Sequence, residues 1–193
     1  MEQFYLEKEE ILKNFELINE ELKLIDVHGE ILIAGGASMC IAFSARPSTK
    51  DIDAVYEPKS IINDIAVKIA LQKGMPISWL NDSVKGFMNQ KAYEKKMFLK
   101  NYSNLKLYLV LPEYLLAMKL MSSRVESETD IKDIIFLMKY LKIDTVQKAN
   151  QVLESAFKSE HILPKTKYVI EECLEVILEE NKSIASKNNK AKK

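Results

Sequence analysis

The sequence contains the stretch Ile31-Leu32-Ile33-Ala34-Gly35-Gly36-Ala37-Ser38, and the stretch Thr49-Lys50-Asp51-Ile52-Asp53-Ala54-Val55 follows shortly afterwards. The first is an apolar run that ends at a glycine pair and a small hydroxyl residue, which is typical of a buried strand that turns directly into a helix. In the second, two aspartates alternate with aliphatic residues, as in a strand with one polar face. The two stretches together predict a strand–helix–strand unit.

The two aspartates indicate a metal site. Positions 51 and 53 of a strand point to the same face, roughly 6.5–7 Å apart along the backbone. Two carboxylates at that spacing repel each other unless a cation lies between them. A divalent metal ion bound by oxygen ligands relieves the repulsion. We therefore predict that Asp51 and Asp53 are catalytic metal ligands; the alternative is a solvated strand end.

The glycine pair indicates a phosphate site. A turn that opens a helix presents backbone N–H groups and the positive end of the helix dipole to an anion, and glycine lets that backbone approach closely. Gly35, Gly36 and Ser38 are the predicted phosphate contacts; the alternative is a tight turn without a ligand. The two arginines, Arg46 and Arg124, have the planar fork that suits phosphate. A phosphate seat beside metal carboxylates indicates phosphoryl or nucleotidyl transfer.

Further motifs follow in a recognisable order. They are Arg46 before Ser48-Thr49-Lys50-Asp51-Ile52-Asp53, Leu111-Pro112-Glu113 before Leu116-Ala117-Met118-Lys119-Leu120, then Arg124, then Asp130-Ile131-Lys132-Asp133. With the glycine turn they resemble the nucleotidyltransferase superfamily, whose signature is a Gly-Gly or Gly-Ser turn followed by Asp-hydrophobic-Asp. The order over residues 30–142 resembles its abortive-infection branch, the AbiEii-like type IV toxins.

The resemblance implies roles for three more residues. A lysine at the position of Lys119 faces the triphosphate in that family, and an aspartate near the nucleotide serves as catalytic base. We prefer Asp133 as the base, with Asp130 as the alternative and as a nucleotide contact. Many superfamily members take a third metal carboxylate from a later strand. The predicted strand over 105–111 has no acidic residue, so either Asp133 or Asp82 substitutes or the site is degenerate.

Composition and periodicity predict the architecture. A chain of 193 residues with 47% hydrophobic residues, five glycines and five prolines can bury a real core and is unlike a loop-rich all-β protein. We predict an α+β fold: a small nucleotidyltransferase-like core, with a mixed β-sheet flanked by helices, over residues 1–110 and a C-terminal helical bundle over 111–181. Residues 182–193 contain five lysines and no acid, and we predict a disordered basic tail.

The same patterns predict the individual elements. An amphipathic helix is expected over 3–26, and Thr129 is expected to cap the helix that ends at residue 141. The predicted strands are 30–34, 51–56, 97–102 and 105–111. The other predicted helices are 37–45, 58–74, 112–122, 145–157 and 165–180.

Charge and cysteine usage narrow the setting. The net charge is zero, but six lysines against Glu94 alone occupy residues 85–106, where they form either a solvated face or a strip that guides a polyanion. No apolar stretch approaches the roughly 18 residues of a membrane span, and the N-terminus is unlike a signal peptide. Cys40 and Cys173 lie in apolar helical patterns, as expected of thiols in a reducing cytoplasm.

The leading hypothesis is a nucleotidyltransferase that uses Mg²⁺ (or Mn²⁺) to transfer NMP from an NTP to an acceptor. The resemblance implies a bacterial toxin–antitoxin setting, a tRNA or a protein hydroxyl as acceptor, and a cognate antitoxin as partner. Adenylylation of a small molecule is a second enzymatic hypothesis, which predicts an acidic acceptor pocket. The alternative from another class is a catalytically degenerate module that binds nucleotide or a protein partner.

Overall fold

The computed structural model of the chain describes residues 4–123 and 127–190, with side chains up to residue 183. The chain divides into two compact units, Met1–Leu111 (unit 1) and Pro112–Lys193 (unit 2). Unit 1 combines a mixed β-sheet with helices, and the regular elements described in unit 2 are helical. The predicted α+β fold class is therefore confirmed.

Unit 1 contains a five-stranded sheet in the order β5-β4-β2-β7-β6 and a two-stranded sheet of β1 and β3. The strands are β1 (Leu6–Glu7), β2 (Gly29–Ile33), β3 (Ser48–Thr49), β4 (Ile52–Glu57), β5 (Leu80–Asn81), β6 (Lys96–Asn101) and β7 (Leu105–Val110). In the larger sheet β2 runs parallel to β7 and antiparallel to β4. β5 runs parallel to β4, and β6 runs antiparallel to β7 at the opposite edge. The sheet is mixed, as the sequence predicted.

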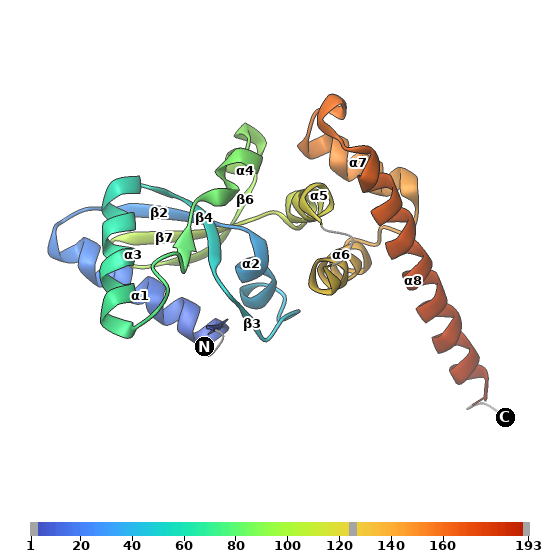
Figure 1. Cartoon of the computed structure of the whole chain (residues 1–193), viewed down its shortest axis with the longest axis horizontal. Coiled ribbons are helices and arrows are strands. Elements are labelled where there is room, and N and C mark those ends of the chain that lie inside the picture. The colour runs from blue at the N-terminus through green and yellow to red at the C-terminus, as the bar shows by residue number, and fades with distance from the viewer. Residues whose placement is uncertain (1–3, 124–126, 191–193) are drawn as a thin grey trace. The chain divides into compact units, whose positions relative to one another are not determined.

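Three helices of unit 1 contribute buried side chains to the core against this sheet: α1 (Lys8–Leu24), α2 (Gly35–Ile41) and α3 (Lys59–Lys73) (Figure 1). A 3-10 turn, η1 (Ser83–Phe87), and the short α4 (Gln90–Glu94) follow β5 in the chain. On α1 the buried side chains recur at the three- and four-residue spacing of one helix face. These are Ile11, Phe15, Ile18 and Leu22, all within the main core.

The alternation along β4 decides which face carries chemistry. Ile52, Ala54 and Tyr56 are buried in the core. Successive strand side chains point to opposite faces, so Asp53 and Val55 lie on the other face of the sheet. The acidic side chain at position 53 is therefore directed away from the core that α1 and α3 cover.

Unit 2 is built from α5 (Pro112–Ser122), α6 (Glu128–Tyr140), α7 (Val146–Ala156) and α8 (Pro164–Lys190), with a 3-10 turn, η2, at Ser159–His161. Helix α5 packs against α6, α7 and α8. The buried side chains of α8 form the single apolar face that the sequence predicted: Val169, Ile170, Cys173, Leu174 and Ile177. Cys40 in unit 1 and Cys173 in unit 2 are both buried cysteines. Within the part of the chain that is described, no helix combines the length and apolarity that crossing a bilayer requires.

Three local predictions differ from the structure. The cap of α6 is Ser127, whose hydroxyl accepts the Asp130 N–H at 3.3 Å, and not Thr129. Helix α2 ends at Ile41 instead of residue 45, because Ser44 adopts a left-handed φ of 50° that a helix does not accommodate. Residues 182–190 continue α8, since a helix nucleated by packed residues adds further turns at little cost. Residues 191–193 lie outside the described residues.

Candidate functional site

The glycine turn and the aspartate strand meet because β2 and β4 are neighbours in the sheet. Their antiparallel register pairs Ile33 with Ala54. One residue further on, the Ala34 N–H donates to the Asp53 carbonyl oxygen at 2.8 Å. The turn from β2 into α2 therefore lies directly against the beginning of β4.

Gly35 is required at this turn for two reasons. Its φ of +58° is left-handed, a conformation that costs a residue with a side chain about 1–2 kcal/mol. A Cβ at this position would also lie 2.4 Å from Asp53 Oδ2 and 3.1 Å from Asp53 Cβ. The missing side chain lets the Asp53 carboxylate lie against the backbone of the turn.

Gly36 likewise leaves room for a neighbouring side chain, the Arg46 guanidinium. A Cβ there would lie 2.6 Å from Thr49 Oγ1 and 2.8 Å from Arg46 Nη1, so the Arg46 guanidinium occupies the space next to this glycine. The structure thus brings Gly35, Gly36, Arg46 and Asp53 together. A backbone turn with an arginine against it is a concentration of hydrogen-bond donors and positive charge that suits a phosphate.

Asp51 lies one residue before β4 and is half-buried. Burial raises the pKa of its carboxyl above the usual range, and the nearby Asp53 charge raises this pKa further. A hydrogen bond from Asn81 and the charges of Lys50 and Arg46 act in the opposite direction. Burial and the Asp53 charge together outweigh these opposing effects, so the pKa of Asp51 is raised.

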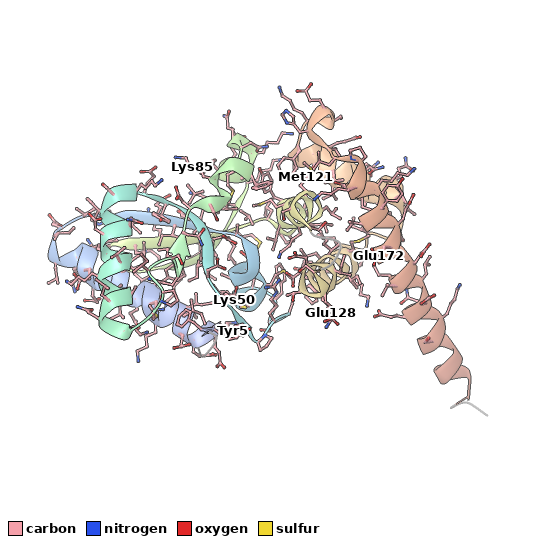
Figure 2. The ribbon with its side chains drawn as sticks, in the orientation of Figure 1. Tyr5, Lys50, Lys85, Met121, Glu128 and Glu172 are labelled. Atoms are coloured by element: carbon pink, nitrogen blue, oxygen red, sulfur yellow. The ribbon has the colours of Figure 1, made fainter. Side chains whose placement is uncertain are left out.

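Lys50, whose charge lowers the pKa of Asp51, lies near the N-terminal segment of unit 1. Its ammonium lies 6.0 Å from the centre of the Tyr5 ring, and Figure 2 shows the two side chains near each other. β1 and β3 pair just beside them, with Leu6 opposite Thr49. The short two-stranded sheet therefore ties the segment before Asp51 to the N-terminal part of unit 1.

The end of β5 and the start of η1 contribute two residues that the motifs did not indicate, Asn81 and Ser83. Asn81 is in register with Asp53, and its Nδ2 donates to Asp51 Oδ2 at 3.4 Å. The Ser83 hydroxyl donates to Asp53 Oδ1 at 3.1 Å. The available sequence signal was the apolar pair Trp79-Leu80 followed by the polar run Asn81-Asp82-Ser83, which is typical of a short strand that ends in a site.

Asp82, one of the two predicted substitutes for a third acid, is engaged elsewhere. Its carboxylate pairs with Lys59 Nζ at 2.5 Å, and the hydrogen bond from Lys59 lowers its pKa. Over the described ranges 4–123 and 127–190, no three His, Cys, Asp or Glu side chains converge as a metal-binding group. In unit 1 the acidic part of the centre is therefore the Asp51–Asp53 pair.

The structure gives Ser38 a different role from the predicted phosphate contact. Its side chain is buried, and its hydroxyl donates to the Ile33 carbonyl oxygen at 3.1 Å. This bond satisfies the carbonyl group of the last residue of β2, just before the turn. Ser38 therefore shapes the turn from within, because its hydroxyl is directed back to the strand.

The other predicted site residues form a cluster within unit 2. Lys119 on α5 pairs with Asp133 Oδ2 at 2.8 Å and with Asp130 Oδ1 at 3.3 Å, both on α6. The exposed fractions of the Lys119 and Asp133 side chains are 11% and 3%. This is a nearly buried lysine between two carboxylates, and it also ties α5 to α6. Arg124, the remaining predicted phosphate ligand, lies outside the described residues.

The comparisons with known proteins give one family match. A search of curated proteins gives no significant match. One solved structure, of an antigenic nucleotidyltransferase-like protein from Paracoccidioides brasiliensis, shares 17% sequence identity over 86% of this chain and 95% of that chain, with a TM-score of 0.45. A family model described as a nucleotidyltransferase of unknown function (DUF6036) matches residues 13–169. The chain therefore belongs to this family of nucleotidyltransferases.

Proposed function

We propose that the protein transfers NMP from an NTP to an acceptor hydroxyl at a centre built on Asp51 and Asp53. The observation that supports this most strongly is the contact between the glycine turn and the second aspartate, where a Cβ on Gly35 would lie 2.4 Å from Asp53 Oδ2. A turn that suits phosphate and a carboxylate that suits a metal ion share one small space. Transfer from a nucleoside triphosphate uses both.

The donor set fits a resident Mg²⁺ or Mn²⁺. Proteins usually bind Mg²⁺ through one or two carboxylates, with waters and substrate phosphates completing the shell. Asp51 and Asp53 are such a pair, and they would hold the ion. When bound, it neutralises polyphosphate charge and lowers the pKa of the attacking hydroxyl.

In this proposal the chain's other residues bind and orient the nucleotide. The backbone of Gly35 and Gly36 and the Arg46 guanidinium bind the polyphosphate. Lys119 contacts the triphosphate and Asp133 acts as general base, with Asp130 as the alternative, roles that rest on the resemblance to the AbiEii-like toxins. Loss of either Asp51 or Asp53 then costs several kcal/mol of transition-state stabilisation, on the order of 3 kcal/mol.

RNA is the acceptor that the surface of unit 1 favours. A lysine–aromatic surface of Lys96, Phe98, Lys106 and Tyr108 occupies β6 and β7 on the face of the sheet that also carries Asp53. The Lys96 ammonium lies 3.7 Å from the centre of the Tyr108 ring, and Phe98 meets the same ring edge-on at 6.1 Å. Phe98 is 62% exposed although it is a large aromatic residue. Exposed aromatics next to lysines are the features that bind single-stranded nucleic acid.

The register supports placing this surface on the same face as the aspartates. Phe98 is paired with Tyr108, Tyr108 with Leu32, and Leu32 with Val55. Paired residues share a face, and Val55 shares its face with Asp53 two residues earlier. Glu30 lies between the two lysines, 3.0 Å from Lys96 Nζ and 4.0 Å from Lys106 Nζ, so the group keeps one net positive charge.

The proposed acceptor predicts that Phe98→Ala and Lys106→Glu weaken RNA binding. Loss of one stacked base costs about 1–3 kcal/mol, and loss of a phosphate contact also reduces the salt dependence of binding. Lys100→Glu is the matched control. Lys100 is paired with the core residue Leu107 and lies over Tyr102, so it belongs to the opposite face of the sheet from Phe98 and Lys106. Fluorescence anisotropy with labelled single-stranded RNA measures the effect. Equal losses in all three variants would remove this surface from the proposal.

The transfer itself is tested by incubating the protein with labelled NTPs, Mg²⁺, and total RNA or protein. We expect label on RNA that disappears in Asp51→Ala and Asp53→Ala. Label on protein would identify a protein hydroxyl as acceptor instead. We extend the proposal to a bacterial toxin–antitoxin setting, in which induced expression arrests growth, the Asp53→Ala variant does not, and a cognate antitoxin binds the toxin.

One observation favours a second candidate, a module that binds nucleotide without turnover. Strand β5 presents the neutral Asn81 beside the aspartates, where an acid would strengthen metal binding. Such a module would bind Mg²⁺ and an NTP but would give no labelled product with any acceptor. Calorimetry together with the transfer assay separates the two candidates.

A further inference from the structure

Asn81 and Ser83 contact the two aspartates of the proposed metal centre, and the inference drawn from these contacts rests on that centre. Asn81 ends β5 opposite Asp53, and Ser83 begins η1 two residues later. Together the two side chains contact both carboxylates of the centre, one each. Neither residue is acidic, and neither belongs to the motifs that the sequence analysis used.

The Asn81 amide is held in one orientation. Its Oδ1 accepts the Ser83 backbone N–H at 3.1 Å, and the Ser83 hydroxyl oxygen lies 2.5 Å from it. With the oxygen directed to Ser83, the NH₂ group is directed to Asp51, where Nδ2 donates to Oδ2 at 3.4 Å. An aspartate could accept from Ser83 but could not donate to Asp51. Asparagine can therefore both accept a hydrogen bond from Ser83 and donate one to Asp51 when the centre holds no cation.

The Ser83 hydroxyl connects the two halves of this arrangement. It has a single proton, and two acceptors lie within reach: Asn81 Oδ1 at 2.5 Å and Asp53 Oδ1 at 3.1 Å. Asp51, Asn81, Ser83 and Asp53 thus form a continuous chain of contacts. Such supporting hydrogen bonds fix the orientation of metal-binding carboxylates.

We propose that Asn81 and Ser83 are positioning residues that hold the Asp51 and Asp53 carboxylates in place and keep the centre at two negative charges, so that it binds a single divalent cation in the absence of nucleotide. A third acid at position 81 would add a negative charge. That charge would strengthen cation binding, while the empty centre would suffer additional repulsion.

Binding of Mn²⁺ to the full-length chain without nucleotide tests the proposal, with the free-ion signal followed by electron paramagnetic resonance. We expect the wild type to bind one Mn²⁺ per chain. Asn81→Ala and Ser83→Ala should each weaken binding roughly tenfold or more, the range seen when supporting partners of metal ligands are removed. Ser83→Thr keeps the hydroxyl and should restore binding. Asn81→Asp should bind Mn²⁺ more tightly, because cation affinity rises with the number of charged ligands, although its empty form unfolds more easily.

Matched controls separate this function from general effects of charge and folding. Asn101→Asp adds a carboxylate at the far end of β6, and Ser155→Ala removes an exposed hydroxyl in unit 2 that donates to the Val152 carbonyl oxygen. Both controls should bind Mn²⁺ as the wild type does. Urea unfolding of each variant identifies any loss of the fold, and the exposed Ser83 variants test the proposal even if an Asn81 variant fails to fold.

Three results would overturn the proposal. They are wild-type affinity in Asn81→Ala and Ser83→Ala, no tightening in Asn81→Asp, and two bound Mn²⁺ in the wild type. The Asp53→Ala variant distinguishes these from failure of the proposed function. If the wild type binds no Mn²⁺, or if Asp53→Ala binds it unchanged, the metal centre itself is wrong and this inference fails with it.

Discussion

At the scale of single residues, Gly35 couples backbone conformation to the position of a carboxylate. Gly74, the αL residue that ends α3, has a similar φ of +65° but nothing within 4 Å of the position of a Cβ. We expect Gly74→Ala to lower the free energy of unfolding by about 1 kcal/mol through φ alone. Gly35→Ala should cost more, because its Cβ also displaces Asp53, and only this variant should weaken metal binding. Urea unfolding followed by circular dichroism measures the difference, and equal costs would contradict the role assigned to Gly35.

A second prediction at this scale is that the Asp51 carboxyl makes the stability of the fold depend on pH. Because burial and Asp53 raise its folded-state pKa above the usual 3.8, the folded chain keeps the proton to a higher pH than the unfolded chain. The contribution of the Asp51 carboxyl to stability is therefore greatest below the unfolded-state pKa of 3.8 and falls as the pH rises through the folded-state pKa.

Asp51→Asn removes this penalty. We expect the metal-free variant to be more stable than the wild type at neutral pH, by about 0.5–2 kcal/mol, the usual range of a single stabilising substitution. The advantage should shrink as pH falls toward the usual value of 3.8. Unfolding by urea in chelator-treated buffer across this pH range measures it. A variant less stable than the wild type at neutral pH would show that the carboxylate stabilises the fold.

At the scale of elements, β5 is held in place by Trp79. This side chain is fully buried, its Nε1 donates to the Ala66 carbonyl oxygen on α3 at 2.9 Å, and its own carbonyl accepts the Ile52 N–H at 2.7 Å. Trp79→Phe should lower the free energy of unfolding by about 1–3 kcal/mol and weaken metal binding, because Asn81 moves with the strand. Tyr168→Leu, at a 70% exposed position, is the control. Unchanged Mn²⁺ affinity in Trp79→Phe would show that β5 does not support the centre.

The elements also show what sequence reasoning could and could not reach. Long amphipathic segments such as α1 were predictable because their apolar residues repeat at the helical period. Asn81 was not, because a two-residue strand has no periodicity and its neighbour β4 is set by tertiary packing. Ser38 was predicted as a ligand from its place in a motif, but its hydroxyl bonds to Ile33. A sequence specifies which groups are near one another in the chain and says little about where each hydroxyl is directed.

At the scale of the whole molecule, the proposed nucleotide contacts are divided between the units, with Arg46, Asp51 and Asp53 in unit 1 and Lys119 in unit 2. If all of them bind one nucleotide, Mg²⁺ with an NTP should slow amide hydrogen exchange in α5 as well as around α2. The same experiment on Asp53→Ala should show no change in either unit. Protection confined to unit 1 would leave Lys119 as a structural partner of Asp133 and remove it from the proposed site.

The central claim is that Asp51 and Asp53 bind a divalent metal ion together with a nucleoside triphosphate. Isothermal titration calorimetry with each of the four NTPs, in the presence of Mg²⁺ and in its absence, tests the claim most directly. We predict that at least one NTP binds the wild type only when Mg²⁺ is present, and that Asp53→Ala abolishes binding while its urea unfolding transition is kept. No binding of any NTP to the wild type, or undiminished binding to Asp53→Ala, would contradict it.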